Sequence, residues 1–316
     1  MYDLIIIGGA AVGCSAAVYA ARRGLNFKVV TDNIGGEVAL SGVVNNWPGI
    51  IDIDGFALAQ KFAEHAKSYG VQFDEGWRVT ELKHKKNHHV VVAKNAVGKE
   101  QTYETKTIII GTGIHPRELG VPGEKELKNK GVTYCTVCDG PLFKGKVTAT
   151  VGSGNSALES ALMMGGIAQK VYVLSKFENT PETHGGFPKG EKILIDKVKA
   201  LPNVEILYNV ATIKIIGTNK VEGLHYTNGT GKDHELPIAA AMVHIGMVPN
   251  SQFATEVKRN PLGEIIVDNL CRTNVPGVFA AGDVTDIPFK QIGIAAGQGI
   301  TAALSAIDYV NRWQEK

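Results

Sequence analysis

The sequence predicts an α/β protein built from two β-α-β units, and three observations lead to this prediction. A strand pattern followed by a glycine-rich turn and a helix occurs at the start of the chain and returns after residue 146. The chain has 316 residues, which is long for one compact domain and suits two. Its hydrophobic content of 44% is sufficient for two cores. These features indicate two Rossmann-like nucleotide-binding domains.

The first unit opens the chain. It consists of strand Leu4–Ile7, turn Gly8–Gly13, an alanine-rich helix ending near Gly24 and strand Phe27–Thr31. A dinucleotide turn needs glycines because the backbone must turn tightly and approach a pyrophosphate at the helix N-terminus. Gly8 and Gly13 fit this pattern, but Ala10 stands where the middle glycine is expected. An ordinary glycine-rich β-α turn is the alternative interpretation.

The second unit follows the full pattern. It consists of strand Lys146–Val151, a glycine turn, a helical stretch to about Gly165 and strand Lys170–Leu174. The turn carries Gly152, Gly154 and Ala157 in a G-x-G-x-x-A pattern directly between a strand and a helix. We therefore predict a second nucleotide site here.

The connecting segments suggest how the two units are joined. A buried strand within Lys106–Gly113 is followed by His115-Pro116, which suits a crossing between domains. A second crossing is expected at Gly246–Asn250. The tail then shows strand Gly277–Ala280, turn Gly282-Asp283 and a small-residue helix from about Gly293 to Tyr309. If this tail completes the first domain, the middle segment is an inserted domain.

Cys135 and Cys138 form a C-x-x-C pair, which indicates redox or metal chemistry in a reducing compartment. Two cysteines at this spacing can close a disulfide, and a nearby helix end can lower one thiol pKa. Half of a zinc site and two inert thiols are the alternatives. Asp139 could transfer the proton that thiol exchange requires, or could be a turn residue before Gly140.

The other cysteines and the histidine-rich stretch have simpler interpretations. Cys14 and Cys271 are expected to be structural thiols. The stretch Lys83–His89 could be a metal or phosphate patch, but a solvated hairpin turn is the favoured prediction because adjacent histidines alternate faces on a strand. No metal site is predicted.

The charge balance and the apolar runs exclude some partners. With 33 basic and 31 acidic residues, nothing indicates nucleic acid or an anionic membrane as a partner. No apolar run approaches the roughly 18 to 20 residues that span a bilayer. The first residues show no basic leader or cleavage-like segment, so a cytoplasmic protein is expected.

In combination, these motifs resemble low-molecular-weight thioredoxin reductase, and also the flavoprotein reductase part of the bacterial alkyl hydroperoxide reductase system. The matching stretches run through almost the whole chain. They are the N-terminal turn, Gly35-Gly36-Glu37-Val38, Asn46-Trp47-Pro48-Gly49, Tyr134–Asp139 with Gly140-Pro141-Leu142-Phe143, the turn at Gly152, Phe279–Asp283 and Lys290-Gln291-Ile292.

The resemblance implies a nicotinamide-binding domain, residues 116–245, inserted into a discontinuous FAD-binding domain made of residues 1–115 and 246–316. The implied FAD-binding residues are Gly8, Ala10, Ala11, Gly13, Gly35, Gly36, Glu37, Val38, Asn46, Gly113, Gly282, Asp283, Lys290, Gln291 and Ile292. The implied nicotinamide-nucleotide residues are Gly152, Gly154, Asn155, Ser156, Ala157, Ser175 and Lys176.

The resemblance also implies an electron path from NAD(P)H through FAD and the Cys135–Cys138 disulfide to a partner protein. Cys138 would accept electrons from the flavin, Cys135 would attack the partner's disulfide, and Asp139 would manage protons. The implied partner is thioredoxin or a glutaredoxin-like protein. Since the chain shows no thioredoxin-like domain before its first turn, that partner is expected to be a separate protein. A homodimer is implied, with hinges near Gly113–Pro116 and Gly246–Asn250.

One segment departs from the family pattern and leaves the electron donor open. NADPH-using members grip the 2′-phosphate with arginines after the second strand of the nicotinamide domain. Here Leu174–Asn179 offers only Lys176, so both NADPH and NADH are candidates. Alternatives are a related reductase fed by ferredoxin, a flavin-dependent dithiol oxidase and a non-enzymatic flavin-binding redox sensor.

Overall fold

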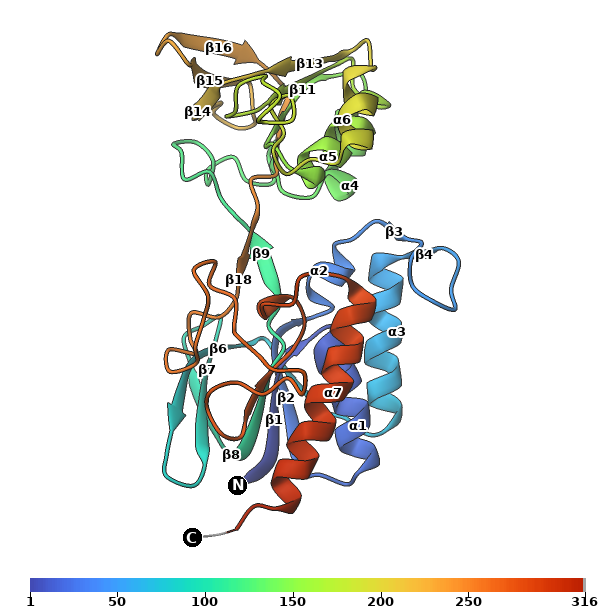
Figure 1. Cartoon of the computed structure of the whole chain (residues 1–316), viewed down its shortest axis with the longest axis vertical. Helices are drawn as coiled ribbons and strands as arrows, with labels where there is room; N and C mark the ends of the chain where they lie inside the picture. The colour runs from blue at the N-terminus through green and yellow to red at the C-terminus, as the bar shows by residue number, and fades with distance from the viewer. Residues whose placement is uncertain (315–316) are drawn as a thin grey trace. The chain divides into compact units, whose positions relative to one another are not determined.

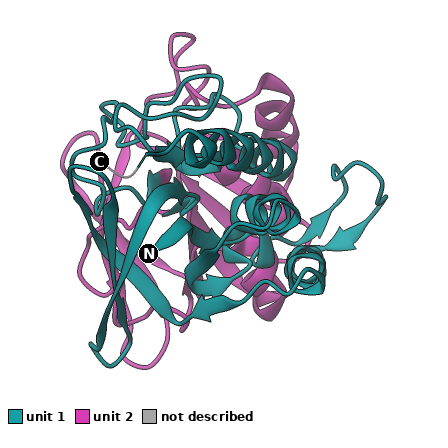
Figure 2. Ribbon diagram, turned by 90° about the horizontal axis from the view of Figure 1, so that it is seen from below, with its two compact units in different colours: residues 1–115, 248–316 teal, residues 116–247 magenta. Residues whose placement is uncertain are grey.

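The computed structural model describes residues 1–314, and the chain divides into two compact units (Figures 1 and 2). Unit 1 comprises Met1–His115 and the chain from Val248 onward, whereas unit 2 comprises Pro116–Met247. The chain crosses between the units twice, at β9 (Ile114–Pro116) and β18 (Met247–Pro249). These two short strands pair with each other.

Unit 1 is built on a seven-stranded mixed sheet with the order β5-β2-β1-β8-β7-β6, and β19 also pairs with β8. Its strands are β1 (Tyr2–Gly9), β2 (Phe27–Ile34), β5 (Phe73–Glu75), β6 (Trp77–His84), β7 (His89–Asn95), β8 (Glu100–Ile110) and β19 (Val278–Ala280), with the small pair β3 (Val43–Val44) and β4 (Ile53–Asp54) outside the sheet. Its helices are α1 (Ala11–Arg22), α2 (Gly36–Ala39), α3 (Gly55–Ser68), the 3-10 turn η2 (Gly282–Val284) and α7 (Ile292–Asn311).

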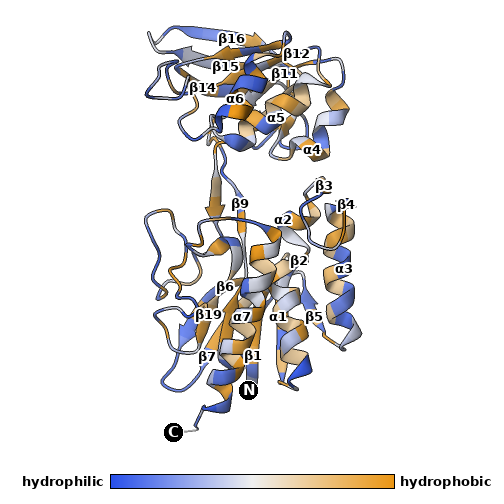
Figure 3. Ribbon diagram, turned by 45° about the vertical axis from the view of Figure 1, so that its right-hand side comes forward, coloured by the Kyte–Doolittle hydropathy of each residue, from blue (hydrophilic) through white to orange (hydrophobic). Residues whose placement is uncertain are grey.

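The central strand β1 is buried on both faces, which explains its continuous apolar run. Leu4 and Ile6 pack into one core with helices α1, α3 and α7. Ile5 and Ile7 pack into the opposite core, against residues of β6, β7 and β8. The strands at the centre of unit 1 are accordingly coloured as hydrophobic in Figure 3. Strand β1 runs parallel to its neighbours β2 and β8. It ends at Gly9, and α1 begins two residues later at Ala11.

The predicted hairpin at Lys83–His89 is confirmed. Strands β6 and β7 pair antiparallel with His84 opposite His89, and the Lys85 amide donates to the His88 carbonyl at 2.9 Å. The Nδ1 atoms of His84 and His89 lie 2.9 Å apart.

Unit 2 is built on a five-stranded parallel sheet with the order β10-β17-β11-β12-β13. Its strands are β10 (Val132–Thr133), β11 (Val147–Val151), β12 (Lys170–Leu174), β13 (Val204–Leu207) and β17 (Ala240–Val243), with the antiparallel sheet β14 (Val210–Ile216), β15 (Gly223–Asn228) and β16 (Asp233–Pro237). Its helices are α4 (Thr136–Asp139), the 3-10 turn η1 (Gly140–Phe143), α5 (Asn155–Gly165) and α6 (Lys192–Lys199).

The parallel sheet of unit 2 also carries a core on each face. Val173 and Met242 pack with α5 and α6, whereas Leu174 and Val243 pack with the three-stranded sheet β14–β16. Unit 2 therefore has three layers: helices, the parallel sheet and the antiparallel sheet. The helices α5 and α6 are seen beside the strands in Figure 1.

The two predicted β-α-β units are confirmed, with bounds that differ by a few residues. The strand predicted within Lys106–Gly113 begins earlier, at Glu100, because its first half pairs with β7. Helices α3 and α6 and the β14–β16 sheet were not predicted. Within residues 1–314, no helix is long and apolar enough to cross a membrane.

Candidate functional site

The first glycine turn brings β1 and α1 into very close contact. Gly8 has a φ of +115°, which favours glycine. A Cβ atom on Gly13 would lie 1.8 Å from the Gly8 carbonyl oxygen, so any side chain there would force the helix away from the strand. Ala10 has a φ of −106°, which any residue can adopt, so this position does not require a glycine. The turn therefore has the close helix-strand packing of a dinucleotide site although its middle glycine is missing.

Two other segments that were predicted to bind FAD contact this turn or the start of α1. The Gly35 amide donates to the Gly9 carbonyl at 3.0 Å, and a Cβ on Gly36 would touch Ala10. A Cβ on Gly282 would lie 2.6 Å from a methyl of Val12 in the first turn of α1. The remaining predicted residues Ala11 and Val38 are buried close by, at the starts of α1 and α2.

Two acidic side chains and the start of α7 belong to the same region. Burial raises the pKa of Glu37 and of Asp283, and the Asp283 charge adds to the rise at Glu37. Lys290 forms an ion pair with Glu264 at 2.9 Å. Asn46 donates to the Gln291 side chain at 3.0 Å, directly before α7 begins at Ile292.

The N-termini of the helices in unit 1 differ in whether a side chain caps them, which bears on whether this region fits a nucleotide. Helix α3 is capped by the Asp54 side chain, which accepts from the Ala57 amide at 3.1 Å. By contrast, α1 and α7 begin with no side-chain cap and no acidic residue in their first turns. The free amides and the positive helix ends are suited to phosphate and to electron-rich groups. The residues present therefore fit a dinucleotide cofactor.

Gly113 directly precedes the first crossing, just after Gly111 and Thr112, which lie against Gly8. Its φ is +63°, no described atom lies within 4 Å of its Cβ position, and its carbonyl accepts from the Asn250 amide at 3.0 Å.

The second glycine turn lies in unit 2, between β11 and α5. A Cβ on Gly152 would lie 2.1 Å from the His244 carbonyl oxygen and 2.9 Å from the Ala157 methyl, so this glycine packs tightly. Gly154 is different, because no described atom lies within 4 Å of its Cβ position. Helix α5 begins there without a side-chain cap or an acidic residue in its first turn. The open backbone at Gly154 leaves room for a phosphate group.

The remaining residues predicted for the second nucleotide differ in availability. The Asn155 side chain donates to the Glu191 carboxylate and accepts from the Glu191 backbone amide. Ser156 is exposed. The Ser175 hydroxyl is buried and donates to the Gly186 carbonyl at 2.6 Å. Lys176 is exposed and lies over the Phe177 ring.

Sequence reasoning missed Lys189 in this region. Its backbone forms a β-bridge with Gly154, which places a second cationic residue beside the turn. No local charge pattern marks it, because Lys189 is the one lysine between Phe177 and Glu191.

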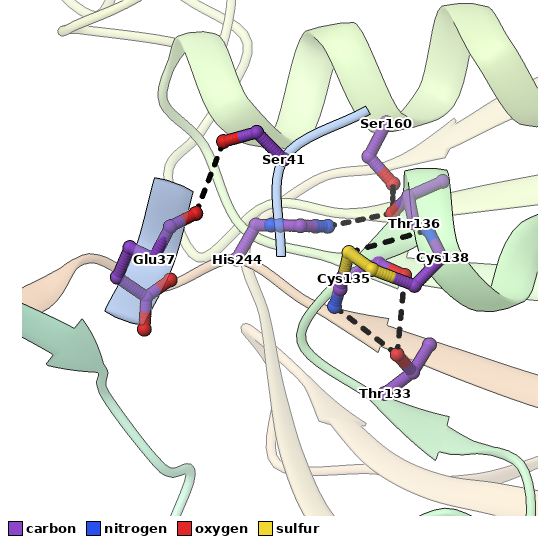
Figure 4. Close-up of a disulfide and its surroundings, with 8 residues drawn as sticks. All are labelled: Glu37, Ser41, Thr133, Cys135, Thr136, Cys138, Ser160 and His244. Carbon is purple, nitrogen blue, oxygen red and sulfur yellow. Dashed lines mark hydrogen bonds between the residues drawn. A yellow bond between two sulfur atoms is a disulfide. The ribbon is translucent and has the colours of Figure 1, made fainter. Parts of the chain in front are cut away.

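Cys135 and Cys138 form a disulfide at the start of α4, and their Cα atoms lie 5.3 Å apart (Figure 4). Cys135 is the N-cap residue, and its sulfur accepts from the Cys138 amide at 3.2 Å. Asp139 ends the same helical turn, and its amide donates to the Cys135 carbonyl at 3.1 Å. We call residues 135–139 the redox turn.

The segment before the redox turn is held by polar side chains. The Cys135 amide donates to the Thr133 hydroxyl at 3.1 Å. The Tyr134 hydroxyl donates to Glu124 at 2.7 Å, and this fully buried carboxylate also accepts from the amides of Leu119 and Gly120. The chain therefore enters the redox turn in one fixed position.

Sequence reasoning also missed a buried polar chain behind the redox turn. The Thr136 hydroxyl lies 2.6 Å from the Ser160 hydroxyl and 2.8 Å from Nε2 of His244 (Figure 4). Burial lowers the pKa of His244 to about 4, so its imidazole is neutral at pH 7. One signal could have found His244: it directly follows a buried strand, at the carboxyl edge of the parallel sheet where ligand sites gather.

The other cysteines do not join the redox turn. Cys14 and Cys271 are both buried and free, and burial raises the pKa of each thiol. Within residues 1–314, no three His, Cys, Asp or Glu side chains are grouped as metal ligands. Cys135 and Cys138 are instead joined to each other in a disulfide.

Comparison with known proteins adds three kinds of similarity. A family model described as pyridine nucleotide-disulphide oxidoreductase matches residues 2–304. A Bacillus subtilis protein named NADH dehydrogenase is 40% identical over 313 residues, and one of the alkyl hydroperoxide reductase subunits of Staphylococcus aureus is 39% identical over the same length. Both matches cover 98% of this chain but only 59% of the relative. The chain thus spans well under two thirds of these curated relatives.

A solved structure matches over nearly its full length. The thioredoxin reductase of Lactococcus lactis, in its FR conformation, superposes with a TM-score of 0.84 at 30% identity, covering 98% of this chain and 99% of that one.

Proposed function

Because this chain belongs to the pyridine nucleotide-disulphide oxidoreductase family, we propose that it is a FAD-dependent thioredoxin-disulfide reductase. It would pass electrons from a nicotinamide nucleotide through FAD and the Cys135–Cys138 disulfide to thioredoxin or a glutaredoxin-like protein. One observation carries the proposal: a disulfide at a helix N-terminus lies in the same compact unit as an open nucleotide turn. A cytoplasmic, homodimeric enzyme is part of this proposal.

FAD would be held by the first glycine turn and its neighbours in unit 1. The α1 amides and Gly8–Gly13 would bind the pyrophosphate, Asp283 would hydrogen-bond the ribityl hydroxyls, and the uncapped start of α7 would face the isoalloxazine. When bound, FAD supplies two-electron chemistry, taking a hydride and passing on an electron pair. The positive end of α7 would stabilise negative charge on a group bound there.

The redox turn would carry the electrons onward. Two electrons and two protons open the Cys135–Cys138 bond to two thiols. Cys135, as a thiolate, then attacks the partner's disulfide, and one partner sulfur leaves as a thiol. Cys138 attacks the resulting mixed disulfide, which reforms Cys135–Cys138 and releases the reduced partner. Asp139 would transfer protons in these steps.

The local geometry supports Cys135 as the attacking residue. Its sulfur already accepts a hydrogen bond from the Cys138 amide at the helix start. An amide donor at this position stabilises a thiolate and lowers the thiol pKa.

NADH is the proposed donor. The segment from Leu174 to Lys192 contains the cations Lys176, Lys189 and Lys192 but no arginine, so it lacks the fork that binds a 2′-phosphate with two hydrogen bonds. The name of the Bacillus subtilis relative points to the same donor.

A second candidate function follows from the 39% identity to the alkyl hydroperoxide reductase protein of Staphylococcus aureus. In this case the chain would be the reductase part of a hydroperoxide-reducing system. The electrons would leave through the same redox turn, but the acceptor would be a thioredoxin-like carrier of a peroxidase. A panel of acceptors separates the two functions.

The test is an anaerobic turnover assay of the flavin-loaded protein with NADH, in which thioredoxin, a glutaredoxin-like protein and a peroxidase carrier are each offered as acceptor. Reduction of thioredoxin at the highest kcat/KM is the expected result. Cys135→Ser and Cys138→Ser should each lose about 99% or more of this activity while the flavin stays bound, because the exchange needs both sulfurs.

Cys271→Ala is the matched control, since it removes a buried free cysteine outside the redox turn and outside the first glycine turn, and it should keep the activity. Retained thioredoxin reduction in both serine variants would overturn the proposal. Rapid oxygen consumption with a small dithiol, without protein disulfide reduction, would instead identify a dithiol oxidase. Negligible turnover with every donor and acceptor would identify a sensor.

A further inference from the structure

The backbone of His244 is fixed at the second nucleotide turn. Its amide donates to the Val151 carbonyl at 2.8 Å, and the preceding Val243 pairs with Val151 in the parallel sheet. Its carbonyl oxygen lies where a Cβ on Gly152 would collide, at 2.1 Å. The residue therefore starts from a rigid anchor, the carboxyl edge of the sheet.

The side chain of His244 reaches from this anchor to the redox turn (Figure 4). Its Nε2 lies 2.8 Å from the Thr136 hydroxyl, which in turn lies 2.6 Å from the Ser160 hydroxyl. Ser160 belongs to α5 and lies 3.4 Å from the Thr150 hydroxyl of β11. Thr136 and Ser160 are 5% and 4% exposed, so water does not compete for these bonds.

This chain of hydrogen bonds needs a polar partner at position 244. The Thr136 hydroxyl has one proton, so it donates to one neighbour and accepts from the other. A neutral imidazole satisfies either order, depending on its tautomer. A glutamine amide can also do so, whereas leucine cannot.

Thr136 is the first helical residue of α4, between the two cysteines. A four-residue helix gains little from its own hydrogen bonds, because nucleating a helical turn is unfavourable. Contacts outside the turn must therefore hold it, and the His244–Thr136–Ser160 chain is buried directly behind it. The closer the two sulfurs are held, the higher their effective concentration and the more stable the disulfide.

We propose that His244 is a positioning residue of the redox turn: through Thr136 it holds the turn in its closed form and so makes the Cys135–Cys138 disulfide harder to reduce. The inference rests on the redox role of this bond given under the proposed function. It assigns His244 no contact with substrate and no step in electron transfer.

The experiment measures the thiol-disulfide equilibrium of the flavin-loaded protein in anaerobic dithiothreitol buffers, with free thiols trapped by alkylation and counted by mass. As Cys135–Cys138 opens, dithiothreitol closes to its own disulfide, so two electrons and two protons are exchanged. His244→Leu and Thr136→Val should each shift the equilibrium towards the dithiol about tenfold, equal to about 30 mV. His244→Gln should stay within about twofold of the wild type.

The double variant tests whether the two residues act as one unit. Since either single change breaks the same chain, His244→Leu combined with Thr136→Val should shift the equilibrium no further than one change does. If each change instead disturbed the fold independently, the two shifts of the equilibrium would add, and His244→Gln would not restore the wild-type value.

Two outcomes overturn the inference in distinguishable ways. If the wild-type disulfide equilibrates reversibly but His244→Leu and Thr136→Val match it, the positioning role is wrong and the proposed function stands. If the wild-type disulfide does not equilibrate at all, both proposals fail. Should His244→Leu fail to fold, the nearly isosteric Thr136→Val decides alone.

Discussion

The space that a Cβ atom would need on Gly13 is already taken by the carbonyl oxygen of Gly8, only 1.8 Å away. The first turn of α1 is thus pressed against the end of β1, which brings the helix amides to the edge of the sheet. This contact, rather than the middle position of the turn, sets the geometry of the first glycine turn, because Ala10 occupies that position at an ordinary φ.

Gly13→Ala should therefore destabilise unit 1 by about 1–3 kcal/mol, the usual cost of overpacking, and weaken flavin retention. Trp47, Trp77 and Trp313 all lie in unit 1, so tryptophan fluorescence during urea unfolding reports on this unit. The matched control is Gly297→Ala, at an exposed helical glycine with no described atom near its Cβ position, which should change stability by less than about 1 kcal/mol. Equal stability of the two variants would contradict the steric explanation.

Gly154→Ala should act on binding instead of folding. A methyl group there meets no described atom of the protein but would occupy the space where a pyrophosphate approaches the backbone. We expect a roughly tenfold higher KM for the nicotinamide nucleotide with unchanged thermal unfolding. Gly152→Ala is the contrasting variant, since its Cβ would lie 2.1 Å from the His244 oxygen and should lower the stability of unit 2. An unchanged KM in Gly154→Ala would place the nucleotide elsewhere.

Donor preference can be changed at the end of β12. The wild type should use NADH with a kcat/KM at least about tenfold above that for NADPH, because no arginine is present to bind a 2′-phosphate. Phe177→Arg places a guanidinium beside Lys176 and should lower the KM for NADPH about tenfold, with little change for NADH. Phe177→Leu serves as the control for loss of the ring. If the wild type prefers NADPH, Lys176 and Lys189 are sufficient to bind the 2′-phosphate without an arginine.

Acid should weaken unit 1 through His89. Burial, aided by the neighbouring His84, lowers the pKa of His89 to about 4, below the 6.5 expected in the unfolded chain. Between these values the unfolded state binds more protons, so stability is lost as the pH falls from 7 to 5. His89 should account for about 1–2 kcal/mol of this loss. The measurement compares urea unfolding at the two pH values: His89→Gln should show a smaller loss than the wild type, and equal losses would refute the assignment.

The sequence predicted most of the elements that have strong local signals. The two strand-turn-helix units follow from hydrophobic period and glycine spacing, and the Lys83–His89 hairpin follows from its polar turn. Helix α3 was missed because most of its buried positions are alanine, which gives a weak apolar pattern, although the turn signals Pro48-Gly49 and Asp54-Gly55 precede it. The β14–β16 sheet was missed because its strands are only half buried.

By itself the sequence determined the fold class, the two glycine turns and the C-x-x-C pair, because each is encoded by residues close together in the chain. Only the tertiary structure decided which distant residues meet them. The hydrogen bond between Thr136 and His244 joins positions 108 residues apart, and the bridge between Gly154 and Lys189 depends on how a loop folds back over a helix start. Parallel strands bring such residues to one edge of a sheet, and that pairing depends on long-range packing that no local pattern encodes.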